Sequence, residues 1–117
     1  MVEKTIIGAS EKIKIFHGED KIKELVGKID TGATKSSIDI NLASELKLGP
    51  ITNTKVVKSA SGVALRPIIM VTVEIQGRKI TEEFTLANRG NLKYPILIGL
   101  NILKKNFMVD PQINCEQ

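Results

Sequence analysis

Asp30 is the side chain in this sequence with the clearest capacity for chemistry. It follows the apolar, strand-like run Leu25-Val26-Gly27-Lys28-Ile29 and opens the segment Asp30-Thr31-Gly32-Ala33. The segment therefore presents one carboxylate at the point where the predicted strand ends. Thr31 adds a hydroxyl able to hydrogen-bond across a symmetric contact, and Gly32 lets the backbone approach a partner group because it carries no Cβ. The same residue types form ordinary turns, so the tetrapeptide alone supports both interpretations.

Short β-prone runs separated by turn residues extend along the chain around this segment. The 117 residues include three Phe, one Tyr and no Trp, so the core must be built from Ile, Val and Leu. In Lys12-Ile13-Lys14-Ile15 the strict alternation predicts a strand with one solvent-exposed face and one buried face. We expect a single domain over residues 1–117, a small and mostly β barrel with one or two short helices. The sequence predicts strands over 2–7, 11–16, 22–29, 36–40, 54–58, 63–75, 79–86, 94–99 and 107–110, and helices over 42–46, capped by Asn41, and 101–105.

A hairpin is predicted in the middle of the chain. Two β-prone runs flank a turn of small residues, and Pro67 marks the entry of the second arm. Because the turn has no large side chains, it can approach a ligand closely. The tip comprises Ser59, Ala60, Ser61, Gly62 and Val63.

Composition argues against several classes of function. The net charge of +4 and pI near 9.3 suit acidic partners, but the basic residues are scattered without an aromatic stacking platform, so we expect no nucleic-acid binding. One cysteine, Cys115, excludes an intrachain disulfide and favours a reducing compartment. His17 is the only histidine and has no paired-ligand spacing with Cys115, so we expect no metal. Without a signal-peptide-like or transmembrane-length run, we expect a cytoplasmic protein with no membrane association.

The order of three features resembles the retropepsin-like aspartic proteases. The Asp30 loop comes first, the glycine-tipped hairpin stands where these proteases have their flap, and Ile96-Leu97-Ile98-Gly99 precedes a short helix as their second motif does. The resemblance covers roughly the whole chain and is strongest to a prokaryotic branch often labelled ATP-dependent zinc proteases, which is associated with ATP-grasp ligases that add glutamate tails to proteins. Positions that match this branch are Ile6-Ile7-Gly8 with Glu11, Lys28 to Ala33 with Ser36-Ser37, Gly62 with Arg66-Pro67, Arg89, and Tyr94-Pro95 with Ile96 to Gly99.

This resemblance implies the closed acid-protease barrel with a flap hairpin, and an aspartic endopeptidase. Asp30 would be catalytic, supported by Thr31, Gly32 and Ala33. Because the chain has one Asp-Thr-Gly motif, the second carboxylate would come from another copy in a homodimer with two-fold symmetry. No covalent intermediate and no cofactor are implied. The zinc and ATP labels find no support, since the sequence lacks His-Glu-x-x-His and a Gly-rich loop ending in Gly-Lys-Ser/Thr.

Two positions depart from the family pattern. Leu100 stands where an Arg usually follows the second-motif glycine, and Thr34 stands where viral relatives have an acidic residue. Both partners of an ion pair are thus missing together, which favours an apolar replacement of the pair over a damaged site. The departures also support an alternative, a non-catalytic dimerisation or peptide-binding module. A third interpretation, an RNA-associated barrel, rests on the pI alone.

Two arginines suggest an acidic substrate. Arg66 and Arg89 match family positions, and a guanidinium binds carboxylates in a bidentate fashion. Together with the positive net charge, this motivates the hypothesis that the substrate is an acidic peptide or protein, such as a glutamate-rich tail. The alternative is that both arginines are surface charges on a hairpin and a loop.

Overall fold

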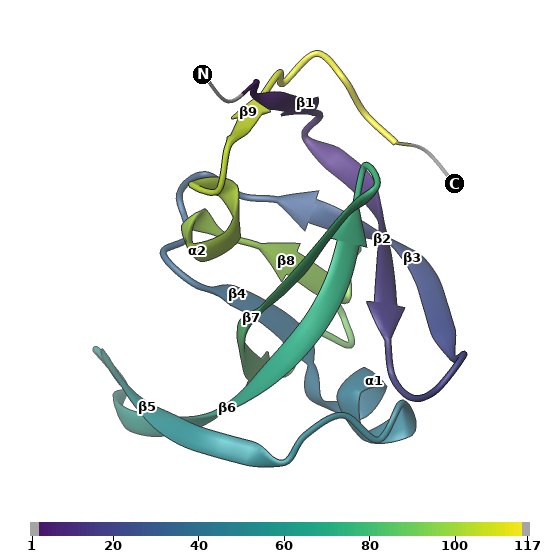
Figure 1. The fold of residues 1–117 in the computed structure, drawn as a ribbon. Coiled ribbons are helices and arrows are strands. Elements are labelled where there is room, and N and C mark those ends of the chain that lie inside the picture. The colour runs from purple at the N-terminus through teal and green to yellow at the C-terminus, as the bar shows by residue number, and fades with distance from the viewer. Residues whose placement is uncertain (1–2, 116–117) are drawn as a thin grey trace.

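The computed structural model describes residues 3–115. This part of the chain contains nine strands and two short helices, and the helices follow β4 and β8 (Figure 1). Neither helix in the described part could span a membrane. The elements are β1 (Thr5–Ile7), β2 (Ser10–Phe16), β3 (Ile22–Ile29), β4 (Ser36–Asp39), α1 (Ile40–Glu45), β5 (Ile51–Ser59), β6 (Gly62–Ile75), β7 (Arg78–Ala87), β8 (Ile96–Ile98), α2 (Leu100–Leu103) and β9 (Phe107–Val109).

Six strands close into a barrel. Their order is β2-β3-β8-β4-β7-β6, and β6 pairs again with β2 to complete the ring. β8 runs parallel to β3 and antiparallel to β4, so this three-residue strand joins the two strands that flank the Asp30 loop. The mostly β, closed-barrel prediction is confirmed.

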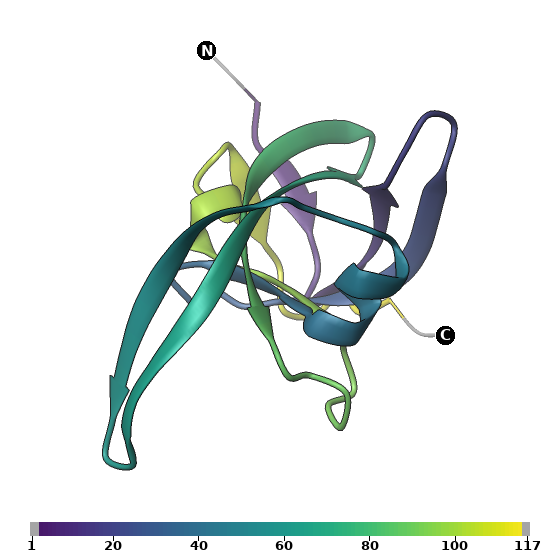
Figure 2. The same cartoon turned by 90° about the horizontal axis from the view of Figure 1, so that it is seen from below.

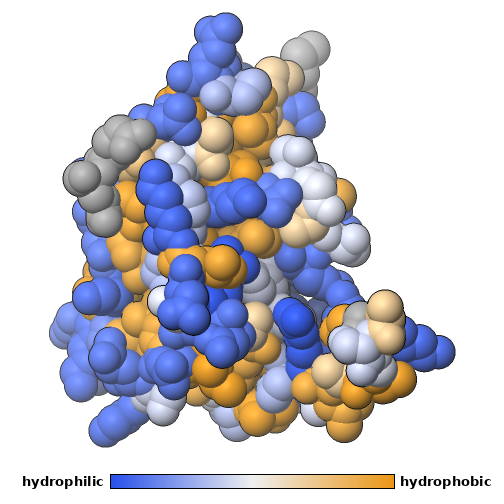
Figure 3. Space-filling view, turned by 180° about the vertical axis from the view of Figure 1, so that it is seen from behind, coloured by the Kyte–Doolittle hydropathy of each residue, from blue (hydrophilic) through white to orange (hydrophobic). Residues whose placement is uncertain are grey.

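β5 extends the sheet beyond the barrel, and within residues 3–115 its one partner strand is β6. Together they form a long hairpin that projects from the body of the molecule (Figures 1 and 2). Gly62 has a φ of +128° just after the two-residue turn at Ala60 and Ser61, a conformation that favours glycine. Val56 and Leu65 lie directly opposite each other and are exposed on the hairpin, which shows hydrophobic surface in Figure 3.

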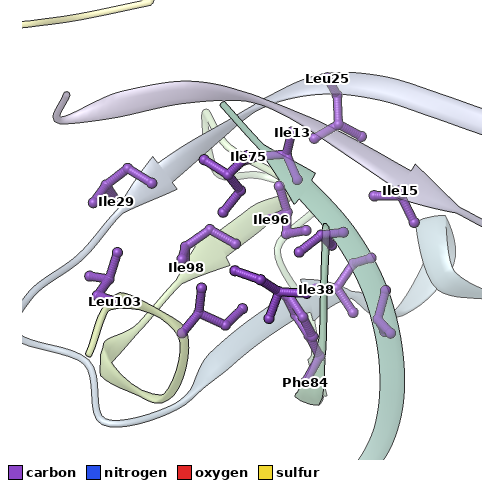
Figure 4. Packing of buried hydrophobic residues seen from close by; sticks show 14 of the residues in the cluster. Ile13, Ile15, Leu25, Ile29, Ile38, Ile75, Phe84, Ile96, Ile98 and Leu103 are labelled. Carbon is purple, nitrogen blue, oxygen red and sulfur yellow. The ribbon is translucent and has the colours of Figure 1, made fainter. Parts of the chain in front are cut away.

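The barrel interior is filled almost entirely by aliphatic side chains. Ile13 and Ile15 of β2 are fully buried while Lys12 and Lys14 are exposed, which confirms the predicted alternation. Figure 4 shows side chains from β2, β3, β4, β6, β7, β8 and α2 converging on one another. Phe84 of β7 is the largest fully buried side chain. Such close packing fixes the positions of the strands that carry the site.

The two ends of the described chain lie together. β1 pairs in parallel with β9, apart from the barrel, and Ile113 O accepts a hydrogen bond from Ala9 N at 2.7 Å. Ser10 Oγ donates to Cys115 O at 3.1 Å and accepts from Cys115 N at 2.8 Å. The segment after β9 is therefore bound to the start of β2.

Several predicted boundaries were wrong. The first helix begins at Ile40, and its N-cap is Asp39, whose carboxylate accepts Leu42 N at 3.2 Å, in place of the predicted Asn41. The second helix begins one residue early, at Leu100, and ends at Leu103. The first strand is described only from Thr5, since residue 2 lies outside the described part.

Candidate active site

Asp30 lies at the C-terminal end of β3, in the loop that leads to β4. Its N–H donates to Ile98 O at 2.9 Å, which joins the loop to the second motif. Gly32 N donates to Asp30 Oδ1 at 2.9 Å, and Ala33 N donates to Asp30 O at 3.2 Å. The Asp30 carboxylate is therefore oriented by Gly32 N and remains partly exposed, with Thr31 and Gly32 exposed beside it.

Gly99 allows the second motif to pack against this loop. A Cβ at Gly99 would stand 2.8 Å from Ala33 O and closer still to Lys35 O, so no other residue fits without displacing backbone. The close approach lets Leu100 N donate to Ala33 O at 2.8 Å and Asn101 N donate to Thr34 O at 3.2 Å. The start of α2 therefore satisfies the carbonyl groups of the Asp30 loop.

A buried polar network supports the same region. Ser36 Oγ donates to Asn101 Oδ1 at 2.8 Å and accepts from Gly99 N at 2.9 Å. Asn101 Nδ2 donates to Glu83 O at 2.9 Å, and Thr85 Oγ1 donates to Ser36 O at 3.3 Å. Ser36 is fully buried and Asn101 is nearly so. Because buried polar groups are costly to leave unpaired, this network holds β4, β7 and α2 in one arrangement.

A cleft of about 300 Å³ separates the Asp30 loop from the projecting hairpin. A hollow between barrel and hairpin is visible at the right of Figure 3. The β4, β7 and β8 strands supply its floor and the hairpin its wall. The lining residues are Ala33, Thr34, Lys35, Ser37, Lys55, Val57, Arg66, Thr85 and Leu97.

Cations dominate the charge around this cleft. Lys28 Nζ lies 3.9 Å from Asp30 Oδ2, and Lys35 Nζ lies 3.3 Å from Glu83 Oε1. Lys55 and Arg66 are directly opposite each other in the hairpin, and among residues 3–115 neither has an ion-pair partner. The cleft therefore carries more positive than negative charge.

Arg89 lies in a different environment, in the loop between β7 and β8. Its Nε donates to Tyr94 O at 3.0 Å, and its backbone N–H donates to Asp39 Oδ1 at 2.9 Å. Burial lowers the pKa of Arg89, and the charges of Asp30 and Asp39 oppose that shift. Arg89 therefore stabilises its own loop, close enough to Asp30 for the two charges to interact. It does not line the cleft.

The structure brings together most of the residues that the sequence indicated. Ala33, Leu97 and Arg66 line the cleft, Asp30 is hydrogen-bonded to Ile98 of the second motif, and Ser59 to Val63 form the end of the hairpin. Of the two arginines predicted to bind substrate carboxylates, Arg66 lines the cleft, whereas Arg89 lies in the loop between β7 and β8. Sequence reasoning named Lys28 only as part of the matched motif and gave no role to Lys35, Lys55 or Asn101. Lys28 stands two residues before Asp30 in the matched motif, whereas Lys35, Lys55 and Asn101 give no signal of their own.

A second hollow, of about 350 Å³, lies near the turn between β2 and β3. Phe16, Lys21, Thr72 and Lys79 are among its lining residues. Its one carboxylate, Asp20, is exposed in that turn. No comparable backbone arrangement orients Asp20, so the cleft beside Asp30 is the better candidate.

Solved structures define the class of this fold. A Legionella pneumophila protein of unknown function is 21% identical with a TM-score of 0.65, and the match covers 94% of this chain and 95% of that one. The simian foamy virus protease is 20% identical with a TM-score of 0.63, over 81% of this chain and 91% of that one. A foamy virus protease–reverse transcriptase, solved with an RNA/DNA hybrid, is 19% identical with a TM-score of 0.62, over 92% of this chain and 13% of that one. The fold is retropepsin-like.

The family model described as RimB-like, retropepsin-like aspartic endopeptidase RimB, matches residues 41–116. The chain therefore belongs to the RimB-like family of retropepsin-like aspartic endopeptidases. No curated protein matches it. The matched residues begin after the Asp30 loop, so the role of Asp30 rests on its sequence context and geometry.

Proposed function

We propose that this protein is a homodimeric aspartic endopeptidase in which each chain contributes one Asp30. The observation that carries the proposal is the placement of Asp30. Its carboxylate is oriented by Gly32 N, its loop is tied to β8, and the loop borders a cleft beneath a projecting hairpin. Membership of an aspartic endopeptidase family supports the same activity. We also propose that residues 1–117 act as one such domain.

The chemistry follows from two carboxylates held close together at a two-fold axis. Because two adjacent carboxylates resist ionising together, the pair shares one proton and titrates as a unit. Aspartic proteases in general use two carboxylates that are coupled in this way. The ionised member takes a proton from a water as that water attacks the peptide carbonyl, and the protonated member donates to the carbonyl oxygen. Neither Asp30 is a permanent acid or base.

The loop and the hairpin have supporting roles in this mechanism. The Thr31 hydroxyl would hydrogen-bond across the axis, while the backbone of Gly32 and Ala33 holds the carboxylates in position. The tip from Ser59 to Val63 would close over the substrate and exclude water. Ser36 is not a nucleophile, because its hydroxyl is fully buried between Gly99 N and Asn101 Oδ1.

Among residues 3–115, Asp39 and Asp110 serve other roles and are poor sources of the second carboxylate. Asp39 accepts hydrogen bonds from Leu42 N and Arg89 N, and so serves as a helix cap and a loop anchor. Asp110 accepts from Gln112 N at 3.0 Å in the segment after β9. Thr31 and Gly32 are exposed, as expected for a surface that a second copy covers. These features support an isologous contact at the Asp30 loop.

An acidic peptide is the substrate class that the cleft favours. Lys55 and Arg66 face it without an ion-pair partner among residues 3–115, and Lys28 adds charge beside Asp30. A groove lined by one sign of charge concentrates ligands of the opposite sign. A glutamate-rich segment would therefore bind better than a neutral one of the same length.

Mass spectrometry of a mixed peptide pool tests the activity. The pool contains glutamate-rich and neutral peptides, and wild type is compared with Asp30→Asn at several pH values. We expect cleavage by wild type, with acidic peptides preferred, and loss of products with Asp30→Asn. Products that persist with Asp30→Asn would show that Asp30 does not carry the reaction.

A non-catalytic peptide-binding module is the second candidate function. Leu100 is 40% exposed beside the Asp30 loop, and Thr34 is exposed where viral relatives have a carboxylate. This candidate predicts that acidic peptides bind wild type and Asp30→Asn equally and that neither protein cleaves them. The same pool, followed by both binding and cleavage, distinguishes the two functions.

A further inference from the structure

Lys28 lies one residue before the end of β3, on the outer face of the barrel. Its neighbours Gly27 and Ile29 are buried, and their strand alternation places the Lys28 side chain on the opposite face. The strand register aligns Lys28 with Leu97, Leu97 with Ser37, and Ser37 with Thr85. Residues opposite each other in register share a face of the sheet. These four residues therefore form one row across β3, β8, β4 and β7.

Three members of this row form the floor of the cleft. Leu97, Ser37 and Thr85 all line it, and Lys28 continues the row at the side of Asp30. The Lys28 Nζ lies 3.9 Å from Asp30 Oδ2, and 49% of its side chain is exposed. Lys28 thus places a cation at the end of the cleft floor, beside the carboxylate proposed to carry the reaction.

The contact with Asp30 leaves the Lys28 ammonium available. A separation of 3.9 Å is too long for a hydrogen bond, so none of its three donors is used by Asp30. The other Asp30 oxygen is bound by Gly32 N. A half-exposed ion pair such as Lys28–Asp30 adds little stabilising free energy. Little free energy is therefore lost when Lys28 exchanges Asp30 for a hydrogen-bonded carboxylate of a ligand. A lysine stem is long and flexible enough to make that exchange.

We propose that Lys28 binds the carboxylate of an acidic substrate residue next to the scissile bond and thereby selects it. The inference rests on the proposed endopeptidase function and adds a position to its substrate preference. In a two-fold dimer each copy supplies one Lys28, so an acidic residue on either side of the bond has a partner. The substrate class is a peptide with Glu or Asp flanking the cleaved bond.

The hairpin cations have a different role. Lys55 and Arg66 lie on the wall of the cleft, and neither forms an ion pair with Asp30. They attract an acidic peptide regardless of where its charges lie, whereas Lys28 would bind a residue beside the cleaved bond. Lys28 is the one lysine or arginine that forms an ion pair with Asp30 among residues 3–115.

Paired peptides that differ only by Glu or Gln next to the scissile bond test this proposal. The measured quantity is the ratio of kcat/KM for the Glu peptide to that for the Gln peptide. We expect Lys28→Met to lower this ratio about 10- to 100-fold, the range of a lost charge-assisted hydrogen bond, and Lys28→Arg to retain most of it. The matched control is Lys12→Met on β2, an exposed lysine on the neighbouring strand.

Two outcomes of the kinetic experiment would overturn the proposal. An unchanged kcat/KM ratio with Lys28→Met would show that other cations recognise the Glu side chain of the peptide. The same ratio measured with Arg66→Gln would then show whether the hairpin does so. An equal loss on both peptides, with a displaced pH profile, would show that Lys28 acts only on Asp30.

Binding in the Asp30→Asn background separates this inference from the endopeptidase proposal. Fluorescence anisotropy compares labelled Glu and Gln peptides with and without Lys28→Met. Glu selectivity that Lys28→Met abolishes supports the inference, even where wild type cleaves neither peptide and the endopeptidase proposal fails. Equal affinity for both peptides, or no binding of the Glu peptide, overturns the inference even where wild type is an active protease.

Discussion

Gly99 shows how one residue can decide the geometry of a site without touching a substrate. Its lack of a Cβ lets β8 and α2 approach the carbonyl groups of Ala33 and Lys35. The bonds from Leu100 N and Asn101 N to that loop depend on this approach. Backbone hydrogen bonds from α2 therefore support the Asp30 loop, in addition to the buried network around Ser36 and Asn101.

We expect Gly99→Ala to destabilise the fold and reduce activity. The new methyl would overlap backbone oxygen atoms, and overpacking of this kind costs about 1–3 kcal/mol or more. Urea unfolding followed by circular dichroism measures the loss. Gly90→Ala is the control, because a Cβ there would meet its nearest atom, Asn88 Oδ1, at 3.7 Å. Equal stability of Gly99→Ala and Gly90→Ala would contradict the packing argument.

At the residue scale, the sequence indicated the loop and the second motif but not the buried polar network between them. Asp30, Thr31 and Gly32 form a recognisable motif because their chemistry is local. The partnership of Ser36 with Asn101 joins positions 65 residues apart, and it depends on the pairing of β4 with β8. A single sequence contains no signal for such a pair.

At the scale of elements, the N-cap residue of α1 joins the start of that helix to the loop that contains Arg89. Its N-cap, Asp39, accepts Leu42 N with one oxygen and Arg89 N with the other. We expect Asp39→Ala to lower the free energy of unfolding by about 1–2 kcal/mol, as for other lost caps. Asp39→Asn retains an acceptor and should lose less, and thermal unfolding of both variants compares them. Similar losses for both variants would show that the Asp39 charge matters more than the cap.

The contact between β7 and the segment after α2 predicts a pH dependence. Lys105 Nζ lies 2.7 Å from Glu82 Oε2, and this hydrogen bond, opposed by partial burial, lowers the pKa of Glu82. A carboxyl group with a lowered pKa in the folded state stabilises the protein above its ordinary pKa, and that stabilisation is lost as pH falls through the folded value.

We therefore expect Lys105→Met to be less stable than wild type at neutral pH. The pair is half-exposed, so the difference should be at most about 1 kcal/mol. It should stay constant above about pH 5 and shrink as the pH falls below that value. Urea unfolding at a series of pH values measures it, with Lys104→Met as the exposed control. A difference that grows toward acid pH would contradict the assignment.

Most elements were predictable because alternation and turn residues are local signals. The run from Ile22 to Ile29 matches β3, and the glycine-tipped hairpin matches β5 and β6. The start of α1 was misplaced because Asn41 and Asp39 are both good caps, and the bond to Arg89 N from another loop holds Asp39 at that position. The partner of β1 was not predictable, since β9 is its only pairing in the described chain and lies about a hundred residues away.

At the scale of the whole molecule, the Asp30 loop is exposed. Mixing of subunits tests whether a second copy of the chain completes the proposed active site. Wild type and Asp30→Asn are mixed in varying proportions and allowed to exchange. With one Asp30 required from each chain, activity should fall as the square of the wild-type fraction, to about one quarter at equal amounts. Proportional loss, to about one half, would indicate that each chain works alone. Sedimentation at the assay concentration supplies the independent measure of dimer formation.

The insertion of β8 between β3 and β4 has a consequence for the order of events during synthesis. Asp30 N and Ala33 O find their partners in Ile98 and Leu100, nearly seventy residues later in the chain. Until those residues leave the ribosome, β3 and β4 have no strand between them and the Asp30 loop has no support. Non-local pairing of this kind also forms slowly. The Asp30 loop can therefore reach the arrangement described here only after residue 100 has been synthesised.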